Sequence, residues 1–68
     1  MKVELNGERR ELPAGATVAD AVEQAGAPPQ GRGLAVAVDG EVVPRAEWHR
    51  TAVPDGGTVE VLTAVQGG

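Results

Sequence analysis

A turn signal near the start of the chain constrains its fold more than any other feature. Residues 1–5 alternate between apolar and polar side chains, which is the period of a half-buried strand. Asn6-Gly7 follows at once, and this pair tolerates the positive φ angles of a type I′ turn. The sequence therefore predicts a β-hairpin. Its return strand, residues 8–12, is mostly charged and is expected to be an edge strand that Pro13 ends.

A helix is predicted next, because Thr17 and Asp20 form a variant of the capping box. The Thr17 hydroxyl can accept from a backbone N–H near Asp20, and a carboxylate is favoured in the first helical turn. Apolar residues then recur at helical spacing and form one narrow stripe, namely Val18, Ala21, Val22 and Ala25. Gly26 stands where a left-handed C-terminal cap belongs, so the helix is expected to end there.

The second half of the chain is predicted to form three more strands. Residues 34–38 alternate, Asp39-Gly40 turns the chain, and residues 41–43 form a short fourth strand. After a further turn of Asp and Gly residues, residues 58–65 form the most β-prone segment of the sequence. These segments are expected to pair within one sheet.

The segment 45–53 has no clean period and is expected to be a turn or a single helical coil. It carries Trp48, the sole aromatic residue. Tryptophan is enriched at the centres of protein interfaces, but in a small core it also covers one end of a sheet. Both roles stay open for Trp48 at this point.

The order of elements is thus hairpin, helix, hairpin-like pair and final strand. A chain of 68 residues satisfies this order by laying the helix across one face of one sheet. We therefore predict an α+β fold of the ubiquitin-like β-grasp type, with one mixed sheet of four to five strands. Residues 1–64 are expected to form the globule, and residues 65–68 a flexible C-terminal diglycine tail.

Composition excludes several kinds of chemistry. The chain has no Cys and no Ser, so it offers no thiolate ligand, no disulfide and no Ser or Cys nucleophile for which His49 could act as a base. The carboxylates lack the spacing of a calcium-binding loop, and the sequence lacks the paired histidines of a zinc site. We predict no catalytic residue and no metal site.

Charge and hydropathy narrow the range of partners. A net charge of −4 argues against binding to the phosphates of nucleic acids, which draws on clustered Lys and Arg. Arg9 and Arg10 form the only adjacent basic pair and are expected to be solvated on the edge strand. No apolar stretch approaches the length of a membrane span. We expect a cytoplasmic, soluble chain that is monomeric when free.

The final pair, Gly67-Gly68, carries the candidate chemistry. Two residues without Cβ can lie extended in a channel too narrow for any other side chain and can bring an unhindered α-carboxylate to a deep active site. A carboxylate is a poor electrophile until it is adenylated. In an acyl-adenylate, AMP can leave as a sulfur nucleophile adds, which gives a thiocarboxylate. We therefore predict Gly68 as the site of adenylation and of the thiocarboxylate, with Gly67 and Gln66 threading the channel.

The order of several short motifs along the chain resembles that in the ThiS family of bacterial thiamine-biosynthesis sulfur carriers. This family lies within a wider group that includes the molybdopterin-synthase small subunit and ubiquitin. The likeness spans the whole chain. The motifs are Leu5-Asn6-Gly7-Glu8, Leu12-Pro13, Ala16-Thr17-Val18, the segment 38–45, Asp55-Gly56 and Val65-Gln66-Gly67-Gly68.

The resemblance implies a reaction cycle in which the chain is a protein co-substrate and not itself an enzyme. An ATP-dependent, ubiquitin-activating-type enzyme (ThiF-like) would adenylate Gly68, and sulfur derived from cysteine would replace AMP. A thiazole synthase (ThiG-like) would then take the sulfur. The chain would bind no cofactor, since ATP is used by the activating enzyme. Family members often end in three glycines or place a small residue before Gly-Gly, whereas this chain has Gln66.

Other functions remain open on the sequence. Carriers for molybdopterin or for tRNA or amino-acid sulfuration share the same chemistry, and a β-grasp interaction module would use no acyl chemistry at all. Alternation assigns Ala35, Ala37 and Leu62 to the sheet face opposite the helix. The other face would hold Leu34, Val36, Val38, Val59 and Val61. Because exposed apolar patches often mark partner surfaces, we predict that Ala35, Ala37 and Leu62 form a docking face.

Overall fold

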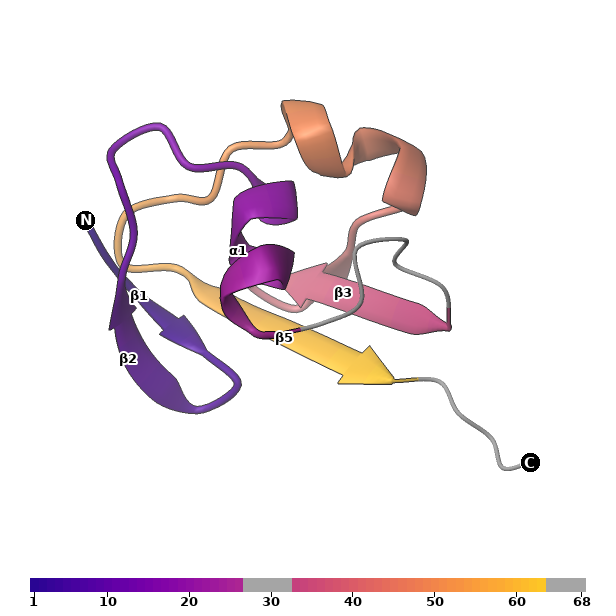
Figure 1. The fold of residues 1–68 in the computed structure, drawn as a ribbon, viewed down its shortest axis with the longest axis horizontal. Helices are drawn as coiled ribbons and strands as arrows, with labels where there is room; N and C mark the ends of the chain where they lie inside the picture. Colours follow the sequence, from indigo (N-terminus) through magenta and orange to yellow (C-terminus); the bar gives the residue numbers. More distant parts are fainter. Residues whose placement is uncertain (27–32, 64–68) are drawn as a thin grey trace.

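A five-stranded mixed sheet carries one α-helix across one of its faces (Figure 1). The structure is a computed structural model that describes residues 1–26 and 33–63. The strand order is β2-β1-β5-β3-β4, which confirms the predicted α+β, β-grasp architecture. In chain order the elements are β1 (Lys2–Leu5), β2 (Glu8–Glu11), α1 (Val18–Gln24), β3 (Leu34–Val38), β4 (Glu41–Val42), the 3-10 helix η1 (Arg45–Arg50) and β5 (Thr58–Thr63).

The first hairpin forms as its turn signal predicts. Asn6 and Gly7 have φ angles of 51° and 83°, and Leu5 pairs with Glu8 across the two-residue loop. β2 is an edge strand, as predicted. Arg9 is exposed as expected, whereas solvation is only partial for Arg10. Its side chain is half-buried, and its Nη1 donates to the carbonyl of Gln24 at the end of α1, at 3.4 Å. Cross-strand register turns Arg10 toward the helix because it pairs with the buried Val3.

Helix α1 begins with the predicted capping box. The Thr17 hydroxyl accepts from the Asp20 backbone N–H at 3.3 Å, and the Asp20 carboxylate accepts from the Thr17 backbone N–H at 2.9 Å. Two N–H groups that the first turn leaves without helical partners are thereby satisfied. Gly26 follows the helix with a φ of 78°, as its predicted capping role requires.

The last described strand, β5, lies in the middle of the sheet. It pairs with β1 in parallel through Glu4↔Thr58 and Leu5↔Val59, and with β3 in antiparallel fashion along the length of β3. β5 was predicted over residues 58–65, and its described part runs to Thr63. Residues 64 and 65, and with them the predicted boundary between globule and tail, lie outside the described residues.

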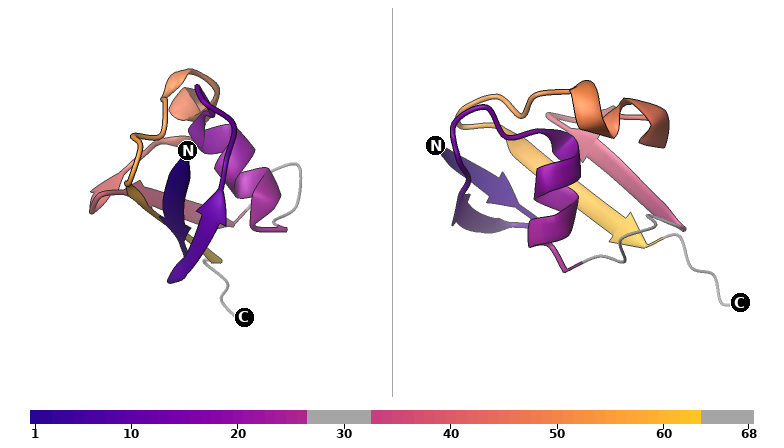
Figure 2. Two further views of the ribbon diagram at one scale, coloured as in Figure 1. Left: turned by 90° about the vertical axis from the view of Figure 1, so that its left-hand side faces the viewer. Right: turned by 45° about the horizontal axis from the view of Figure 1, so that its top comes forward.

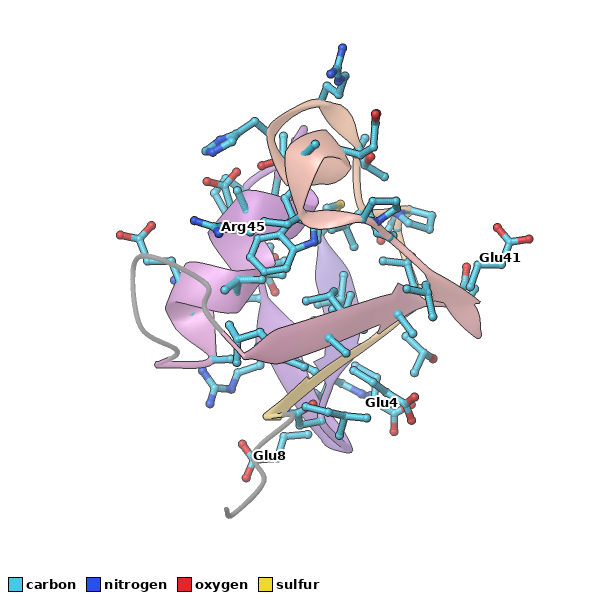
Figure 3. The ribbon with its side chains drawn as sticks, turned by 90° about the vertical axis from the view of Figure 1, so that its right-hand side faces the viewer. Glu4, Glu8, Glu41 and Arg45 are labelled. Carbon is cyan, nitrogen blue, oxygen red and sulfur yellow. The ribbon has the colours of Figure 1, made fainter. Side chains whose placement is uncertain are left out.

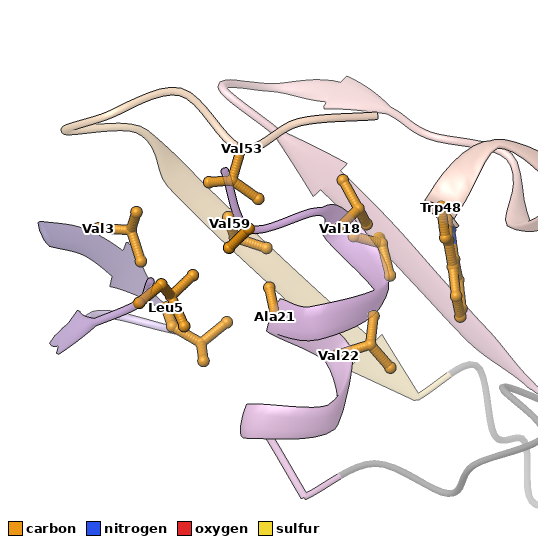
Figure 4. Packing of buried hydrophobic residues seen from close by; sticks show 11 residues of the cluster. Val3, Leu5, Val18, Ala21, Val22, Trp48, Val53 and Val59 are labelled. Atoms are coloured by element: carbon orange, nitrogen blue, oxygen red, sulfur yellow. The ribbon is translucent and has the colours of Figure 1, made fainter. Parts of the chain in front are cut away.

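The core fills the space between the sheet, α1 and η1 (Figure 4). The helices pack against each other on the same side of the sheet (Figure 2). The buried residues come from every layer: Val3, Leu5, Leu12, Ala16, Val18, Ala21, Val22, Val36, Trp48, Val53 and Val59. A thin core made mostly of Val, Leu and Ala is what a domain of this size can build.

Trp48 belongs to this core, which decides between its two predicted roles. Only 6% of the residue is exposed, and its indole Nε1 donates to the Val43 carbonyl at 2.9 Å. Figure 4 shows Trp48 at the end of the cluster remote from Val3. The predicted turn or helical coil around it is the 3-10 helix η1. β4 ends one residue earlier than predicted, although the Val43 N–H still donates to the Val36 carbonyl at 2.8 Å.

Candidate functional site

The strand that precedes Gly68 in the sequence is β5, which lies in the centre of the sheet. Thr63, the last described residue, pairs with Leu34 of β3, and Gly68 follows five positions later. A fully extended segment of that length spans at most about 18 Å. Gln66, Gly67 and Gly68 lie outside the described residues, so their predicted roles in threading, adenylation and sulfur transfer stay predictions.

The structure places Ala35, Ala37 and Leu62 on the face of the sheet away from α1. Ala35 and Leu62 are direct cross-strand partners in β3 and β5. Their chain neighbours Val36 and Val61 point the other way, where Val36 is buried and Val61 packs against the core. Leu62 is 59% exposed, which is unusual for a leucine in the central strand of a sheet. We call the surface around these residues the outer face.

Sequence reasoning missed Val42, which also lies on the outer face. Val42 pairs with Ala37 and is 73% exposed. Among the described residues, Val42 and Leu62 are the two large apolar residues that are exposed. A two-residue loop fixes hairpin register, so Asp39-Gly40 already implied that Val42 stands opposite Ala37. Among the described residues, the outer face thus has four apolar members: Ala35, Ala37, Val42 and Leu62.

Carboxylates border this apolar surface. Glu60 is exposed and pairs with Ala37, and alternation along β5 puts it on the same face as Leu62. Glu4 of β1 pairs with Thr58, and its side chain points away from α1 (Figure 3). The surface would therefore complement a partner with an apolar centre and basic residues beside it.

A separate shallow hollow lies at the β1–β2 end of the sheet. Its volume is about 260 Å³, and its lining mixes charges of both signs with small groups: Lys2, Val3, Glu4, Arg9 and Gly56. None of the four apolar residues of the outer face lines it. Because its cations stand beside a carboxylate, the hollow has no clear preference for an anionic ligand.

The described titratable side chains lie at or near the surface. No charged or polar side chain is buried among the described residues, and His49 is exposed on η1. Within residues 1–26 and 33–63, no cluster of three His, Asp or Glu side chains could hold a metal ion. No helix in this part of the chain is long and apolar enough to cross a membrane.

In the part of the chain that the structure describes, the pKa of one carboxyl group, that of Glu11, is shifted. Glu11 accepts a hydrogen bond from the α-amino group of Met1 at 2.9 Å. This hydrogen bond, helped by the positive charge of the amino group, lowers the pKa of Glu11 below its ordinary value. The same amino group donates to the Leu12 carbonyl at 2.7 Å. The pair therefore ties the start of β1 to the end of β2 and takes no part in the outer face.

Comparisons with known proteins agree with this fold. No curated protein matches the chain. Among solved structures, the chain is similar to the crystal structure of a thiamine biosynthesis protein (ThiS) from Geobacter metallireducens. The two are 27% identical with a TM-score of 0.76, and the match covers 100% of each chain. The family model described as "ThiS family" matches residues 3–68, from the first strand through the final diglycine. This chain therefore belongs to the ThiS family.

Proposed function

We propose that this chain is a sulfur carrier for thiazole formation in thiamine biosynthesis, and that the carboxylate of Gly68 is its working group. The observation that carries the proposal is the family match, which continues through Gly67-Gly68. ThiS-family proteins are small sulfur carriers and not catalysts.

The proposed cycle has two steps on the carrier. A carboxylate oxygen of Gly68 attacks the α-phosphorus of ATP, pyrophosphate leaves, and a mixed anhydride with AMP forms. Hydrosulfide, or a sulfur donor derived from cysteine, then adds to the acyl carbon, AMP leaves, and loss of a proton gives the thiocarboxylate. The first step is necessary because a free carboxylate does not react with sulfur nucleophiles, whereas an acyl-adenylate does.

Two partner enzymes follow from this cycle. An adenylating enzyme of the ubiquitin-activating type binds ATP, so the carrier itself needs no cofactor, and a thiazole synthase accepts the sulfur. We place both reactions in the cytoplasm, because adenylation consumes ATP. Gln66 and Gly67 would lie in the narrow entrance of each active site, since glycine offers no Cβ to obstruct it.

The outer face is the surface we assign to docking of both enzymes. A carrier with a short reactive segment gains from a second contact, because binding of the globule raises the effective concentration of the segment at the active site. Ala35 and Ala37 are small enough to allow close approach, and Leu62 and Val42 provide exposed apolar area. The neighbouring Glu60 favours partners with basic residues beside an apolar patch.

The test is conversion of Gly68 in a defined reaction. The chain is incubated with ATP, sodium sulfide and the adenylating enzyme, and its intact mass is measured. We expect the mass to rise by the difference between one sulfur and one oxygen atom, with the change located at Gly68 by fragmentation. An unchanged mass, in a reaction where an established sulfur carrier is converted by its own enzyme, would contradict the proposal.

A β-grasp interaction module without acyl chemistry is the second candidate, favoured by the exposed apolar residues of the outer face. A variant that lacks Gly68 separates the two functions. A carrier without Gly68 should still bind the adenylating enzyme but should not be converted. For an interaction module, deletion of Gly68 should change nothing, because binding would be its whole function.

A further inference from the structure

The side chain of Asn6 makes the most unusual contact among the described residues. Its Oδ1 accepts from the backbone N–H of Val61 at 2.8 Å, and its Nδ2 donates to the carbonyl of the same residue at 3.3 Å. One side-chain amide therefore pairs with both backbone groups of a residue 55 positions away. Val61 belongs to β5, the strand that leads to Gly68.

This contact continues the parallel ladder between β1 and β5 beyond the point where the β1 backbone ends. The Glu4 N–H donates to the Gly57 carbonyl at 2.9 Å, and the Asn6 N–H donates to the Val59 carbonyl at 2.9 Å. In a parallel ladder, the next pair of bonds on β5 falls two residues later, at Val61. The β1 backbone has by then turned away at Asn6-Gly7, and the Asn6 amide supplies the missing donor and acceptor.

The residue type required at position 6 follows from two demands. The backbone has a φ of 51° there, which Gly and Asn adopt more easily than other residues. The contact with Val61 also needs one donor and one acceptor on a short side chain. Glycine satisfies the first demand only, and ionised aspartate has no donor for the Val61 carbonyl. Asparagine satisfies both.

We propose that Asn6 is a positioning residue for sulfur transfer. Its side chain extends the hold on the β1 side of β5 as far as Val61, and so helps to set the direction in which β5 leads toward Gly68. The inference rests on the proposed function of Gly68. On the other side of β5, pairing with β3 continues to Thr63, so loss of the Asn6 contact should release one edge of the strand without unfolding the domain.

Amide hydrogen exchange tests the structural part of this inference. Asn6→Gly keeps the turn and removes both bonds, so the Val61 amide should exchange about 5- to 100-fold faster, since two hydrogen bonds no longer oppose local opening. The side chain of Asn6 bonds to Val61 and not to Leu62, and the Leu62 amide should also exchange several-fold faster if the end of β5 is released. Unchanged exchange at Leu62 would overturn the inference.

Asn6→Asp adds a pH profile that a general loss of stability would not produce. The protonated carboxyl can donate to the Val61 carbonyl, whereas the ionised group cannot. Protection of Leu62, corrected for intrinsic exchange, should therefore be close to that of the parent about one unit below the usual aspartate pKa of about 3.9 and should fall about two units above it. The bond to the Val61 carbonyl exists only in the protonated form and disappears as pH rises, whereas the bond accepted from the Val61 N–H remains. Equal protection at both pH values would contradict the role of the donor.

Adenylation kinetics test the functional part. For Asn6→Gly we expect KM for the carrier to rise by a factor of about 2 or more, because a less defined direction of β5 lowers the effective concentration of Gly68, while kcat stays unchanged. Thr17→Ala is the matched control: it removes the capping box at the far end of α1, and its KM should equal that of the parent. If both variants raise KM alike, stability is the cause and the inference fails. If the parent itself is not adenylated, the proposed function fails, and exchange at Leu62 still decides whether Asn6 holds β5.

Discussion

Replacement of Leu62 should weaken binding of the chain to the adenylating enzyme and to the thiazole synthase alike. Leu62 is 59% exposed on the outer face, so most of its apolar surface remains available to a partner. The residue contributes little to the core, and substitutions at exposed positions usually change stability by no more than about 0.5 kcal/mol. A binding defect can therefore be separated from a folding defect.

The size of the effect follows from the exposed fraction. Full burial of a leucine side chain is worth about 1.5–3 kcal/mol. If a partner covers the 59% that is exposed in the free chain, the contact contributes about 1–2 kcal/mol. Since about 1.4 kcal/mol corresponds to a tenfold change, Leu62→Ala should raise Kd by a factor of about 4 to 20. Leu62→Glu should raise Kd further than Leu62→Ala does, because a carboxylate must then be desolvated beside Glu60 when the partner binds.

Calorimetric titration with each enzyme measures Kd, and circular dichroism with Trp48 fluorescence verifies folding. Trp48 is a suitable reporter because it is the sole tryptophan and is buried. Ala37→Asp places a charge on the same face and should behave as Leu62→Glu does. Ala46→Glu is the control: Ala46 is exposed on η1, which lies on the α1 side of the sheet.

The reasoning is refuted if Leu62→Glu and Ala37→Asp remain folded and bind both enzymes as tightly as the parent. It is refuted equally if Ala46→Glu weakens binding as much as they do, since the defect would then come from added negative charge in general. Loss of binding to one enzyme only would show that the two enzymes use different surfaces.

Three further substitutions give distinct outcomes. Gly67→Ala adds a methyl group where the proposed channel is narrowest, so adenylation should fall while the thermal unfolding midpoint stays the same; unaltered turnover would dismiss the channel argument. Gly57→Ala should lower the free energy of unfolding by about 1–3 kcal/mol, because its Cβ would stand 2.9 Å from the Pro54 carbonyl oxygen and from Pro54 Cγ; a stability equal to the parent in chemical denaturation would show that this turn relaxes freely. Glu11→Gln should lower the unfolding temperature above the ordinary pKa of glutamate, and the difference from the parent should vanish as pH falls through the lowered pKa of Glu11, because protonation removes the ion pair with Met1; a difference independent of pH would exclude that ion pair as the cause.

Local signals predicted most of the fold. The Asn6-Gly7 turn and the Thr17–Asp20 capping box depend on residues adjacent in sequence, and both form as expected. Alternation assigned the outer and inner faces of β3 and β5 because the register of a central strand is fixed by the buried face. The prediction was less specific where the period is unclear, as in η1, whose 3-10 turns are too short to establish a helical repeat.

Contacts between distant residues could not be predicted. The Asn6 amide meets Val61 only because β1 and β5 are neighbours and β1 ends where it does. The half-buried position of Arg10 likewise depends on where α1 ends relative to β2. The position of Val42 on the outer face could have been predicted, because the Asp39-Gly40 loop sets the register of its hairpin. The candidate chemistry at Gly68 was inferred from the two glycines that end the sequence and from the resemblance to the ThiS family, not from packing.

The parallel pairing of β1 and β5 also determines how the domain responds to mechanical force. The chain enters the sheet at the start of β1 and leaves it at the end of β5, and these strands lie side by side in the same direction (Figure 1). Tension between the two termini slides the strands past each other, so their hydrogen bonds are loaded together in shear. Antiparallel neighbours pulled from adjacent ends would separate one bond at a time. Resistance to forced unfolding is governed by the unfolding rate, and shear raises the barrier because several bonds must break at once. A domain connected in this way can be pulled by the segment after Thr63 without its strands being peeled apart one after another.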